Sequence, residues 1–356
     1  MARRPEFHAL AVSEIERLTD DSVALTFAIP PELADDYAFT PGQHVTVRCP
    51  AAGDDGRRTY SLCSAPGALR IGVKKVAGGV FSGYALERLK VGDDIEVMTP
   101  AGHFTTRIDA ANPRHRVAIV AGSGITPALS ILRATLEGEP GSCFTLIDGN
   151  RTSGSAMFLD EIADLKDRFP GRLSVFHVLS REQRESALLT GRLDREKLGL
   201  LLDAAVGRHR VDEWFLCGPI AMVDMTRAVL KARGVADSAV HFELFHVESA
   251  SPVEPAVAGV AAAAGASRVT ILLAGRSTSL LVGRDRDVLH AAMTVRPDVP
   301  YGCTNGMCGT CRAKVTEGAV EMDHCYALDD AELSAGFVLT CQAQPRTEQV
   351  TLDYDA

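Results

Sequence analysis

The chain has 356 residues, of which 46% are hydrophobic and 23% are charged, a composition typical of globular proteins and of neither disordered chains nor fibres. At roughly 100 to 200 residues per domain, this length predicts two or three domains and excludes a single small module. The 37 basic and 46 acidic residues give a formal net charge of −9. Since this charge repels nucleic-acid phosphates and anionic lipid, we expect neither nucleic acid nor a membrane as a partner.

The N-terminus carries basic residues with no apolar core behind them, so it does not resemble a secretory signal. The most apolar long stretch, residues 252–266, is rich in Ala, Gly and Pro and is interrupted by Glu254. It is too short to span a bilayer. We therefore expect a cytoplasmic protein.

Residues 1–110 alternate apolar and polar positions in short runs bounded by turn residues. The runs cover residues 23–30, 41–50, 68–76 and 93–100. Short strands with regularly spaced turns predict an antiparallel β-barrel or sandwich.

Residues 111–245 change to continuous apolar runs that alternate with helical patterns. The predicted strands cover 116–121, 143–150, 173–180, 212–219 and 240–245, and the predicted helices lie near 127–138, 156–168, 194–204 and before 233. Strict strand–helix alternation predicts an α/β domain, with a parallel sheet covered by helices.

Residues 246–266 lose this periodicity, and we interpret them as an interdomain linker. A third domain is expected over residues 267–356. It begins with a predicted hairpin at 268–275 and 277–283, continues with a short helix near 287–294, and ends with a strand at 348–354.

Five of the nine cysteines lie in this third domain, and four of them are spaced as Cys303-x4-Cys308-x2-Cys311 followed after 29 residues by Cys341. An odd number of cysteines fits a disulfide framework poorly and a metal or cluster site in a reducing compartment well. Plant-type ferredoxins hold a [2Fe–2S] cluster with three thiolates on one loop and a fourth from elsewhere in the fold. From residue 267 onward the chain resembles such a ferredoxin, which implies a β-grasp fold.

A four-thiolate zinc site is the alternative, but zinc sites usually pair two short Cys-x2–4-Cys segments. The glycines between the ligands, Gly302, Gly306 and Gly309, allow the backbone to wrap around a cluster and direct N–H groups at its sulfurs. Cys325 falls outside the spacing, and we interpret it as a buried or incidental thiol.

In the first domain, Arg58-Thr59-Tyr60-Ser61 follows a strand that opens with Pro41-Gly42-Gln43, and the segment 78–82 lies at a predicted helix start where N–H groups could receive a pyrophosphate. This combination resembles the FAD-binding barrel of the ferredoxin–NADP reductase superfamily. The resemblance implies that Arg58 contacts the FAD phosphates, that Tyr60 packs on the flavin and that Ser61 lies near its reactive nitrogen. The residues assigned to FAD in this way are Arg58, Thr59, Tyr60, Ser61, Val80, Phe81 and Ser82.

In the second domain, the loop 122–127, GSGITP, lies between a predicted buried strand and a helix, where glycines permit close approach of a phosphate. It departs from G-x-G-x-x-G, which disfavours a conventional Rossmann dehydrogenase, but it matches the loop of the same superfamily. The resemblance also places Cys217 beside the nicotinamide and Phe245 over the flavin, so that Ser61, Cys217 and Phe245 are the candidate catalytic residues. The expected nucleotide-binding residues are Gly122, Gly124, Thr126, Pro127, Ser180, Arg181, Cys217, Gly218 and Pro219.

Ser180 and Arg181 follow the third strand of this domain, and Arg184 is close behind. A hydroxyl and guanidinium groups suit a 2′-phosphate, and the superfamily's NADP-specific members carry the same Ser-Arg-Glu run there. Asp148, near the end of the second strand, is instead typical of sites that bind a free ribose hydroxyl. We favour NADPH and keep NADH as an alternative.

The three modules imply a linear path: a hydride from NADPH to FAD, then single electrons through the cluster to a partner protein. The chain resembles reductase components of multicomponent oxygenases, most clearly in GSGITP, in GHF (102–104) and in residues 326–343, although the cluster loop departs from the pattern at Thr304 and Asn305. The resemblance implies a di-iron oxygenase as partner. Residues 317–332 contain six acidic and no basic side chains and form a candidate docking surface. The alternatives are the reductase of a steroid hydroxylase or aromatic-ring dioxygenase, and a non-catalytic iron–sulfur redox module.

Overall fold

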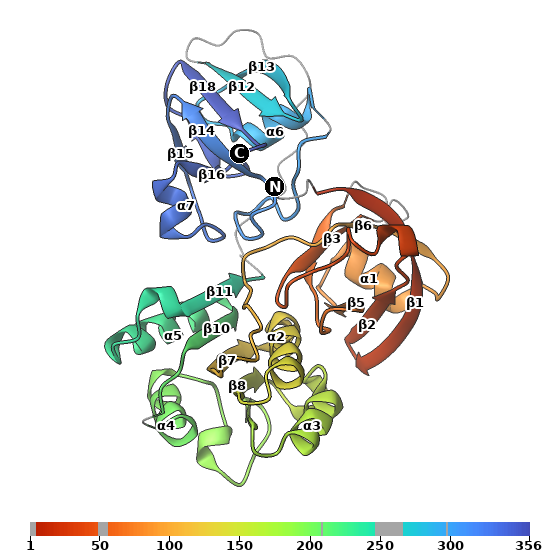
Figure 1. Cartoon of the computed structure of the whole chain (residues 1–356), viewed down its shortest axis with the longest axis vertical. Helices are drawn as coiled ribbons and strands as arrows, with labels where there is room; N and C mark the ends of the chain where they lie inside the picture. Colours follow the sequence, from red (N-terminus) through yellow and green to blue (C-terminus); the bar gives the residue numbers. More distant parts are fainter. Residues whose placement is uncertain (1–4, 49–55, 208, 246–265, 297) are drawn as a thin grey trace. The chain divides into compact units, whose positions relative to one another are not determined.

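The computed structural model of this protein describes residues 5–48, 56–207, 209–245, 266–296 and 298–356. It separates into two compact units, Met1–His246 and Val247–Ala356 (Figure 1). Residues 246–265 of the expected linker lie outside the described residues. Within the described ranges, every helix is too short or too polar to cross a membrane.

The N-terminal half of the first unit is a six-stranded antiparallel barrel, as predicted. Its elements are β1 (Phe7–Thr19), β2 (Ser22–Phe27), β3 (His44–Arg48), β4 (Arg58–Ser61), β5 (Leu69–Lys74), the helix α1 (Val80–Glu87) and β6 (Asp94–Met98). The strand order is β4-β3-β6-β1-β2-β5, and an antiparallel bridge between Leu62 and Ile71 joins the two ends of the sheet.

Strand β1 is absent from the sequence-based expectation. It is the longest strand, but its pairing with β2 shifts register between Val12 and Glu14 and again between Arg17 and Thr19. Each shift interrupts the alternation of inward and outward side chains, which is the signal that a strand leaves in a sequence.

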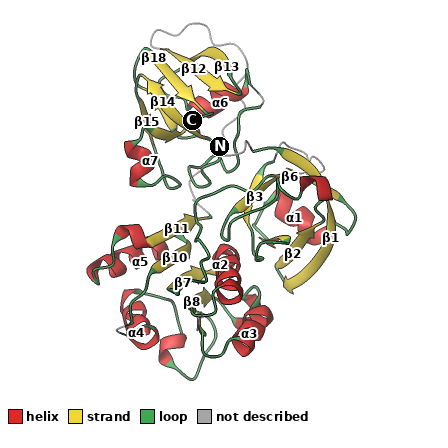
Figure 2. Ribbon diagram, in the orientation of Figure 1, coloured by secondary structure: helices red, strands yellow, loops and turns green. Residues whose placement is uncertain are grey.

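The second half of the first unit is an entirely parallel five-stranded sheet, again as predicted. Its strands are β7 (His115–Ala121), β8 (Cys143–Asn150), β9 (Leu173–Leu179), β10 (Glu213–Gly218) and β11 (Val240–Leu244). The helices are α2 (Ile125–Gly138), α3 (Leu159–Arg168), α4 (Arg195–Ala205) and α5 (Ile220–Ala232). In the order β11-β10-β7-β8-β9, α2 and α3 cover one face and α4 and α5 the other (Figure 2).

Barrel and sheet pack closely within this unit. The hydroxyl of Ser130 on α2 donates to the Ser64 carbonyl at 2.6 Å, and Arg70 on β5 pairs with Glu161 on α3 at 2.9 Å. A Cβ added to Gly72 on β5 would lie 2.7 Å from the Thr126 methyl group. Only a residue without a side chain therefore fits at Gly72.

The second unit has the mixed sheet expected of a β-grasp domain. Its elements are β12 (Ser267–Leu273), β13 (Arg276–Val282), α6 (Val288–Met293), β14 (Arg312–Glu317), β15 (Val320–Met322), α7 (Asp330–Ser334), β16 (Phe337–Leu339), β17 (Ala343–Pro345) and β18 (Gln349–Asp353). The main order is β13-β12-β18-β14-β16, in which the first strand, β12, pairs in parallel with the last, β18.

Candidate functional site

Strand β4 carries the expected flavin-binding tetrapeptide. Arg58 is exposed, and the Thr59 hydroxyl lies 3.3 Å from that of Thr46 on the neighbouring strand. The Tyr60 ring lies 5.4 Å from the ring of Phe81, tilted by 46°. Burial raises the pKa of Tyr60, and the positive charge of Arg58 opposes the shift, so Tyr60 stays protonated at neutral pH. A neutral, half-buried aromatic ring is the surface on which a flavin packs.

Ser61 ends β4 beside a carboxylate from the other half of the unit. Its hydroxyl donates to Oε2 of Glu243 on β11 at 2.9 Å. Nδ1 of the buried His44 lies 3.7 Å from Oε1 of the same carboxylate, and Cys217 is the register partner of Glu243 across β10 and β11. Burial, and secondarily the charge of Glu243, raises the pKa of the Cys217 thiol. The structure therefore brings together Ser61 and Cys217, which were predicted separately.

Sequence reasoning missed Glu243 and His44. Glu243 lies two positions before the predicted Phe245 in HFELF. An acidic residue near the end of the last predicted strand of this domain was the feature of the sequence that could have identified it. Phe245 is partly buried and packs against the core cluster that contains Cys217.

Helix α1 begins at the predicted pyrophosphate segment. Its N-cap is Gly79, and no described side chain caps the helix. The Ser82 hydroxyl accepts a hydrogen bond from the Val76 N–H at 3.1 Å and lies 3.2 Å from the Gly79 carbonyl. Since this hydroxyl is used within its own turn, the first-turn N–H groups, including those of Val80 and Phe81, are the groups that suit an anion.

The glycines of the 122–127 loop fit a nucleotide phosphate. Gly122 has a φ of +58°, and a Cβ there would meet no described atom within 4 Å. A Cβ at Gly124 would lie 2.2 Å from the Cys217 carbonyl oxygen. The loop thus has open space on one side and backbone contact with β10 on the other.

The remaining residues of these two loops shape the helix starts. The Thr126 hydroxyl donates to the Ser123 carbonyl at 2.9 Å, and Pro127 lies in the first turn of α2, where a missing N–H costs nothing. Gly218 ends β10, and Pro219 is the N-cap of α5. Both helices therefore start at the carboxyl edge of the sheet, where open α/β sheets bind ligands.

The loop after β9 holds the candidate 2′-phosphate residues. Ser180 and Arg181 donate their backbone N–H groups to the carbonyls of Asn150 and Arg151 at 2.9 and 2.8 Å, while the Arg181 side chain is exposed. Glu182 accepts hydrogen bonds from both the N–H and the hydroxyl of Ser153.

Asp148, the residue that is typical of sites for a free ribose hydroxyl, lies near the end of β8. Its side chain is fully buried, and Oδ2 accepts a hydrogen bond from the Asn150 amide at 2.8 Å and lies 3.2 Å from Nδ1 of His177. The second carboxylate oxygen, Oδ1, is buried and has no hydrogen-bond partner among the described residues.

In the second unit the four predicted ligand cysteines form two thiol pairs. Cys303 interacts with Cys308, and Cys311 interacts with Cys341. The pKa of the Cys303 thiol and that of the Cys311 thiol are both raised, mainly by the hydrogen bond to the paired cysteine and next by burial. Among the described residues no three Cys, His, Asp or Glu side chains are arranged to hold a single metal ion. Two cysteines per iron is the ligand set of a [2Fe–2S] cluster, so the donors fit that group.

The cluster loop directs backbone N–H groups at sulfur, as the glycine pattern predicts. The N–H groups of Asn305 and Met307 each lie 3.4 Å from the Cys303 sulfur. Thr304 has a φ of +59°, which is costly for a β-branched residue. Hydrogen bonds from its hydroxyl to the Cys303 carbonyl and from Gln342 to its own carbonyl hold it there.

Comparison with known proteins matches each module in turn. Residues 9–106 match the oxidoreductase FAD-binding domain, residues 118–228 the oxidoreductase NAD-binding domain and residues 271–346 the 2Fe-2S iron-sulfur cluster binding domain.

Several relatives match almost the whole chain. It is 43% identical to a 1,2-phenylacetyl-CoA epoxidase subunit of Escherichia coli over 98% of both chains. It is 33% identical to the ferredoxin reductase component of 3-ketosteroid-9-alpha-monooxygenase of Rhodococcus rhodochrous, over 97% of this chain and 96% of the relative. The fold is similar to that of phthalate dioxygenase reductase, with a TM-score of 0.59, 23% identity and 98% coverage of both chains.

Proposed function

Because this chain belongs to the family of oxygenase reductase components that includes the 1,2-phenylacetyl-CoA epoxidase subunit of Escherichia coli, we propose that its partner is the di-iron oxygenase of a phenylacetyl-CoA epoxidase. The chain is an oxidoreductase that passes electrons from NAD(P)H through FAD and a [2Fe–2S] cluster to an oxygenase. The observation that carries the choice of partner is the 43% identity over 98% of both chains.

The path requires two kinds of electron carrier. FAD, when bound, accepts a hydride and releases single electrons, whereas a [2Fe–2S] cluster accepts one at a time. We assign the flavin to Tyr60, Ser61 and the first turn of α1, and the cluster to the four paired thiols. The buried Cys217 thiol and the Ser61–Glu243 pair shape the place where the nicotinamide meets the flavin.

We further propose NADPH as the preferred donor. The exposed guanidinium of Arg181 is available to a 2′-phosphate, which a planar guanidinium binds well. Asp148, the residue that would favour NADH, is fully buried and accepts a hydrogen bond from Asn150, which supports the choice of NADPH. Four thiol ligands need a reducing compartment for cluster assembly, which supports a cytoplasmic location.

Reconstitution tests the partner. The purified chain, NADPH and the phenylacetyl-CoA epoxidase oxygenase are expected to consume phenylacetyl-CoA in proportion to NADPH oxidised. The matched reaction uses the oxygenase of a 3-ketosteroid 9α-monooxygenase with its steroid. Faster coupled turnover with the steroid system would reject the proposed partner while leaving the reductase activity intact.

A visible spectrum tests the cofactors independently of any partner. We expect flavin bands together with broad iron–sulfur absorption, and rapid bleaching of the flavin bands by NADPH. A colourless, zinc-loaded protein would contradict the assignment of both groups.

A further inference from the structure

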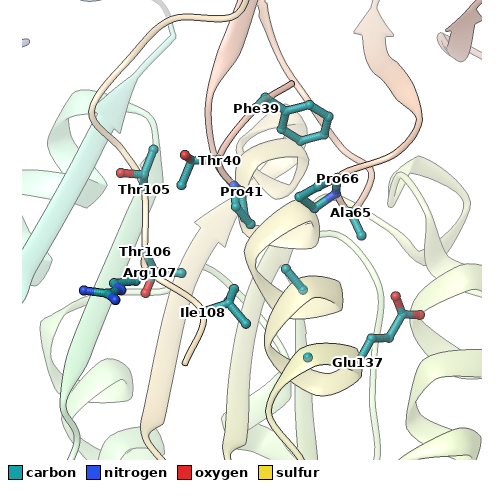
Figure 3. Close-up of a pocket in the computed structure, with 12 residues that line it drawn as sticks. Phe39, Thr40, Pro41, Ala65, Pro66, Thr105, Thr106, Arg107, Ile108 and Glu137 are labelled. Atoms are coloured by element: carbon teal, nitrogen blue, oxygen red, sulfur yellow. The ribbon is translucent and has the colours of Figure 1, made fainter. Parts of the chain in front are cut away.

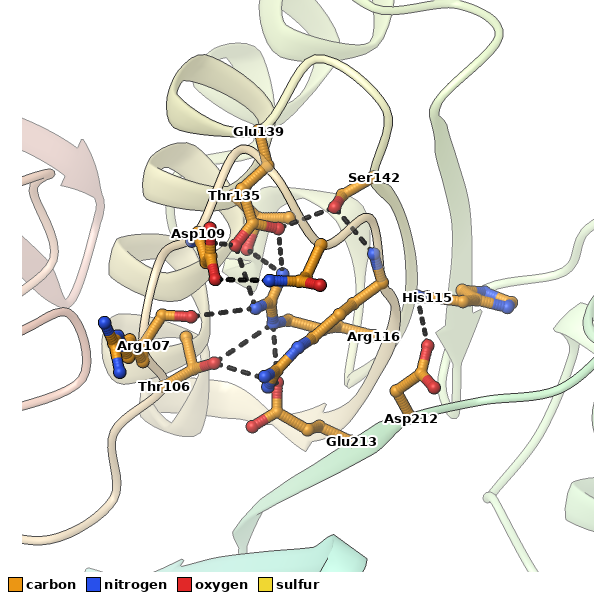
Figure 4. A network of polar contacts seen from close by, with 12 residues as sticks. Thr106, Arg107, Asp109, His115, Arg116, Thr135, Glu139, Ser142, Asp212 and Glu213 are labelled. Atoms are coloured by element: carbon orange, nitrogen blue, oxygen red, sulfur yellow. Dashed lines mark hydrogen bonds and ion pairs between the residues drawn. The ribbon is translucent and has the colours of Figure 1, made fainter.

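A fully buried arginine lies at the start of β7, far from the predicted cofactor residues. Arg116 has an exposed fraction of 0%. Its Nη1 lies 2.6 Å from Oε2 of Glu139 at the end of α2, and its Nε lies 2.8 Å from Oε2 of Glu213 at the start of β10 (Figure 4). Since a buried charge is costly to keep, a buried ion network of this kind needs an explanation.

The same network holds the connector, residues 105–114, which joins the barrel to β7. The Thr106 hydroxyl accepts a hydrogen bond from Nε of Arg116 at 3.1 Å and donates to Oε2 of Glu213 at 2.8 Å. Nη2 of Arg116 donates to the Arg107 carbonyl at 3.2 Å, and the Asp109 N–H donates to Oε1 of Glu139 at 2.7 Å. Three connector residues are thereby tied to the sheet.

The first part of the connector also lines a pocket. A cavity of about 670 Å³ lies between the barrel, the connector and α2 (Figure 3). The connector residues that line it are Thr105, Thr106, Arg107 and Ile108. The polar network therefore restrains the connector in addition to the packing of the barrel against α2.

The network and the predicted hydride site lie at opposite ends of the same two strands. Arg116 and Glu213 are register partners at the amino ends of β7 and β10, and Cys217 lies four residues further along β10. At about 3.3 Å per residue, this separation is roughly 13 Å. A rotation of about 5° at the connector would therefore shift Cys217 by roughly 1 Å relative to the barrel, an error that catalysis tolerates poorly.

We propose that Thr106 and Arg116 are positioning residues for hydride transfer, because they fix the barrel at the angle that brings Ser61 to Cys217 and Glu243. The proposal rests on the assignment of the hydride site to those three residues. Thr106 provides the cleanest test because its hydroxyl links Arg116 to Glu213 without itself being charged.

Thr106→Val in the full cofactor-loaded chain removes the hydroxyl and keeps the shape. We expect flavin reduction by saturating nucleotide, measured by stopped flow, to be roughly three- to tenfold slower. The primary deuterium isotope effect should rise, because hydride transfer becomes more fully rate-limiting. Thr106→Ser restores the hydroxyl and should restore the rate. Thr226→Val is the matched control, since the buried Thr226 hydroxyl has no hydrogen-bond partner among the described residues.

Amide hydrogen exchange supplies a readout that does not depend on activity. In Thr106→Val, peptides covering residues 105–112 should exchange at least about threefold faster, while peptides of α4 should be unchanged. The proposal is overturned if Thr106→Val and Thr226→Val reduce flavin at equal rates, or if Thr106→Ser is as slow as Thr106→Val. If Thr106→Val does not load flavin, Arg116→Lys replaces it, and we expect the same slower flavin reduction and the same faster exchange of residues 105–112. A normal rate in Ser61→Ala would instead reject the assigned hydride site.

Discussion

The hydroxyl of Ser61 donates a hydrogen bond to Oε2 of Glu243 over 2.9 Å, although the two residues are 182 positions apart. Ser61 belongs to the antiparallel barrel, and Glu243 belongs to the edge strand of the parallel sheet. The proposed hydride site therefore takes residues from both halves of the first unit, and neither half contains it alone.

Ser61→Ala tests this relationship. The change removes a hydrogen bond to a charged group, which is worth about 1.5–3 kcal/mol, so we expect nucleotide-driven flavin reduction to slow by roughly 10- to 100-fold. Stopped-flow absorbance measures the rate. Ser64→Ala is the control, since the buried Ser64 hydroxyl bonds to the Ala68 carbonyl in its own turn. Equal rates in the two variants would show that the Ser61–Glu243 contact has no part in hydride transfer.

Cys341→Ser tests the cluster ligands. Loss of one thiolate should remove the iron–sulfur absorption, and electron delivery to the oxygenase should fall by at least about 100-fold, while reduction of the flavin by nucleotide continues. Cys325→Ser, a change to a half-buried thiol in the same unit, should leave both the spectrum and the delivery intact. The assignment fails if Cys325→Ser, and not Cys341→Ser, bleaches the cluster bands.

Arg181→Ala tests the choice of nucleotide. Loss of a charge-assisted contact to the 2′-phosphate should raise the KM for NADPH by roughly 10-fold or more, with little change in the KM for NADH. Arg210 serves as the control, because it is 89% exposed and pairs with Asp212 at 3.2 Å. An unchanged NADPH affinity in Arg181→Ala would reject the assignment.

Glu139→Gln tests the buried network through its pH dependence. Burial raises the pKa of Glu139, but hydrogen bonds from Arg116, Ser142 and the Asp109 N–H outweigh burial and hold the pKa below its ordinary value of 4.5. The lowered folded pKa means that the ionised form stabilises the fold above about pH 4.5, and that this contribution is lost as the pH falls through the folded value.

At pH 7 we expect Glu139→Gln to lower the free energy of unfolding by about 3 kcal/mol. This corresponds to a fall of roughly 10 °C in the temperature of flavin release followed by fluorescence. The difference from the unmodified chain should narrow below about pH 4.5, because Glu139 is then protonated first in the unfolded parent chain and, at lower pH, in the folded one. A difference that stays constant down to pH 3.5 would argue that the loss comes from packing and not from the carboxylate.

The acidic surface of the second unit predicts salt-dependent delivery to the oxygenase. Within it, Glu321 pairs with Arg346 and Glu332 pairs with Arg312, so we assign docking to the exposed Asp323 and Asp330. Added salt should slow reduction of the partner and leave reduction of a small neutral dye unchanged.

The double variant Asp323→Asn, Asp330→Asn should slow partner reduction roughly threefold to tenfold at low salt. Asp237→Asn, which removes an exposed charge from the first unit, is the control. Equal salt dependence in the double variant and its parent would exclude these carboxylates from docking.

Much of the fold could be predicted because its signals are local. The parallel strands are continuous apolar runs, and the predicted and observed ranges differ by one or two residues or coincide, as at 143–150 for β8. Strand β1 was missed because its bulges interrupt the alternation. The position of Asp148 near a strand end is visible in the sequence, whereas its burial beside Asn150 and His177 is decided by the fold.

By itself, the sequence determined the order of the three modules and the spacing of the four cysteines that we assign to the cluster. Cluster spacing, glycine loops and hydrophobic periodicity depend on residues close together in the chain. The tertiary structure decided the pairing of Ser61 with Glu243 and the enclosure of Arg116 by Glu139 and Glu213. These contacts depend on the order β11-β10-β7 and on how the barrel packs against α2. Such long-range packing results from the burial of many side chains at once, so no short segment of the sequence encodes it.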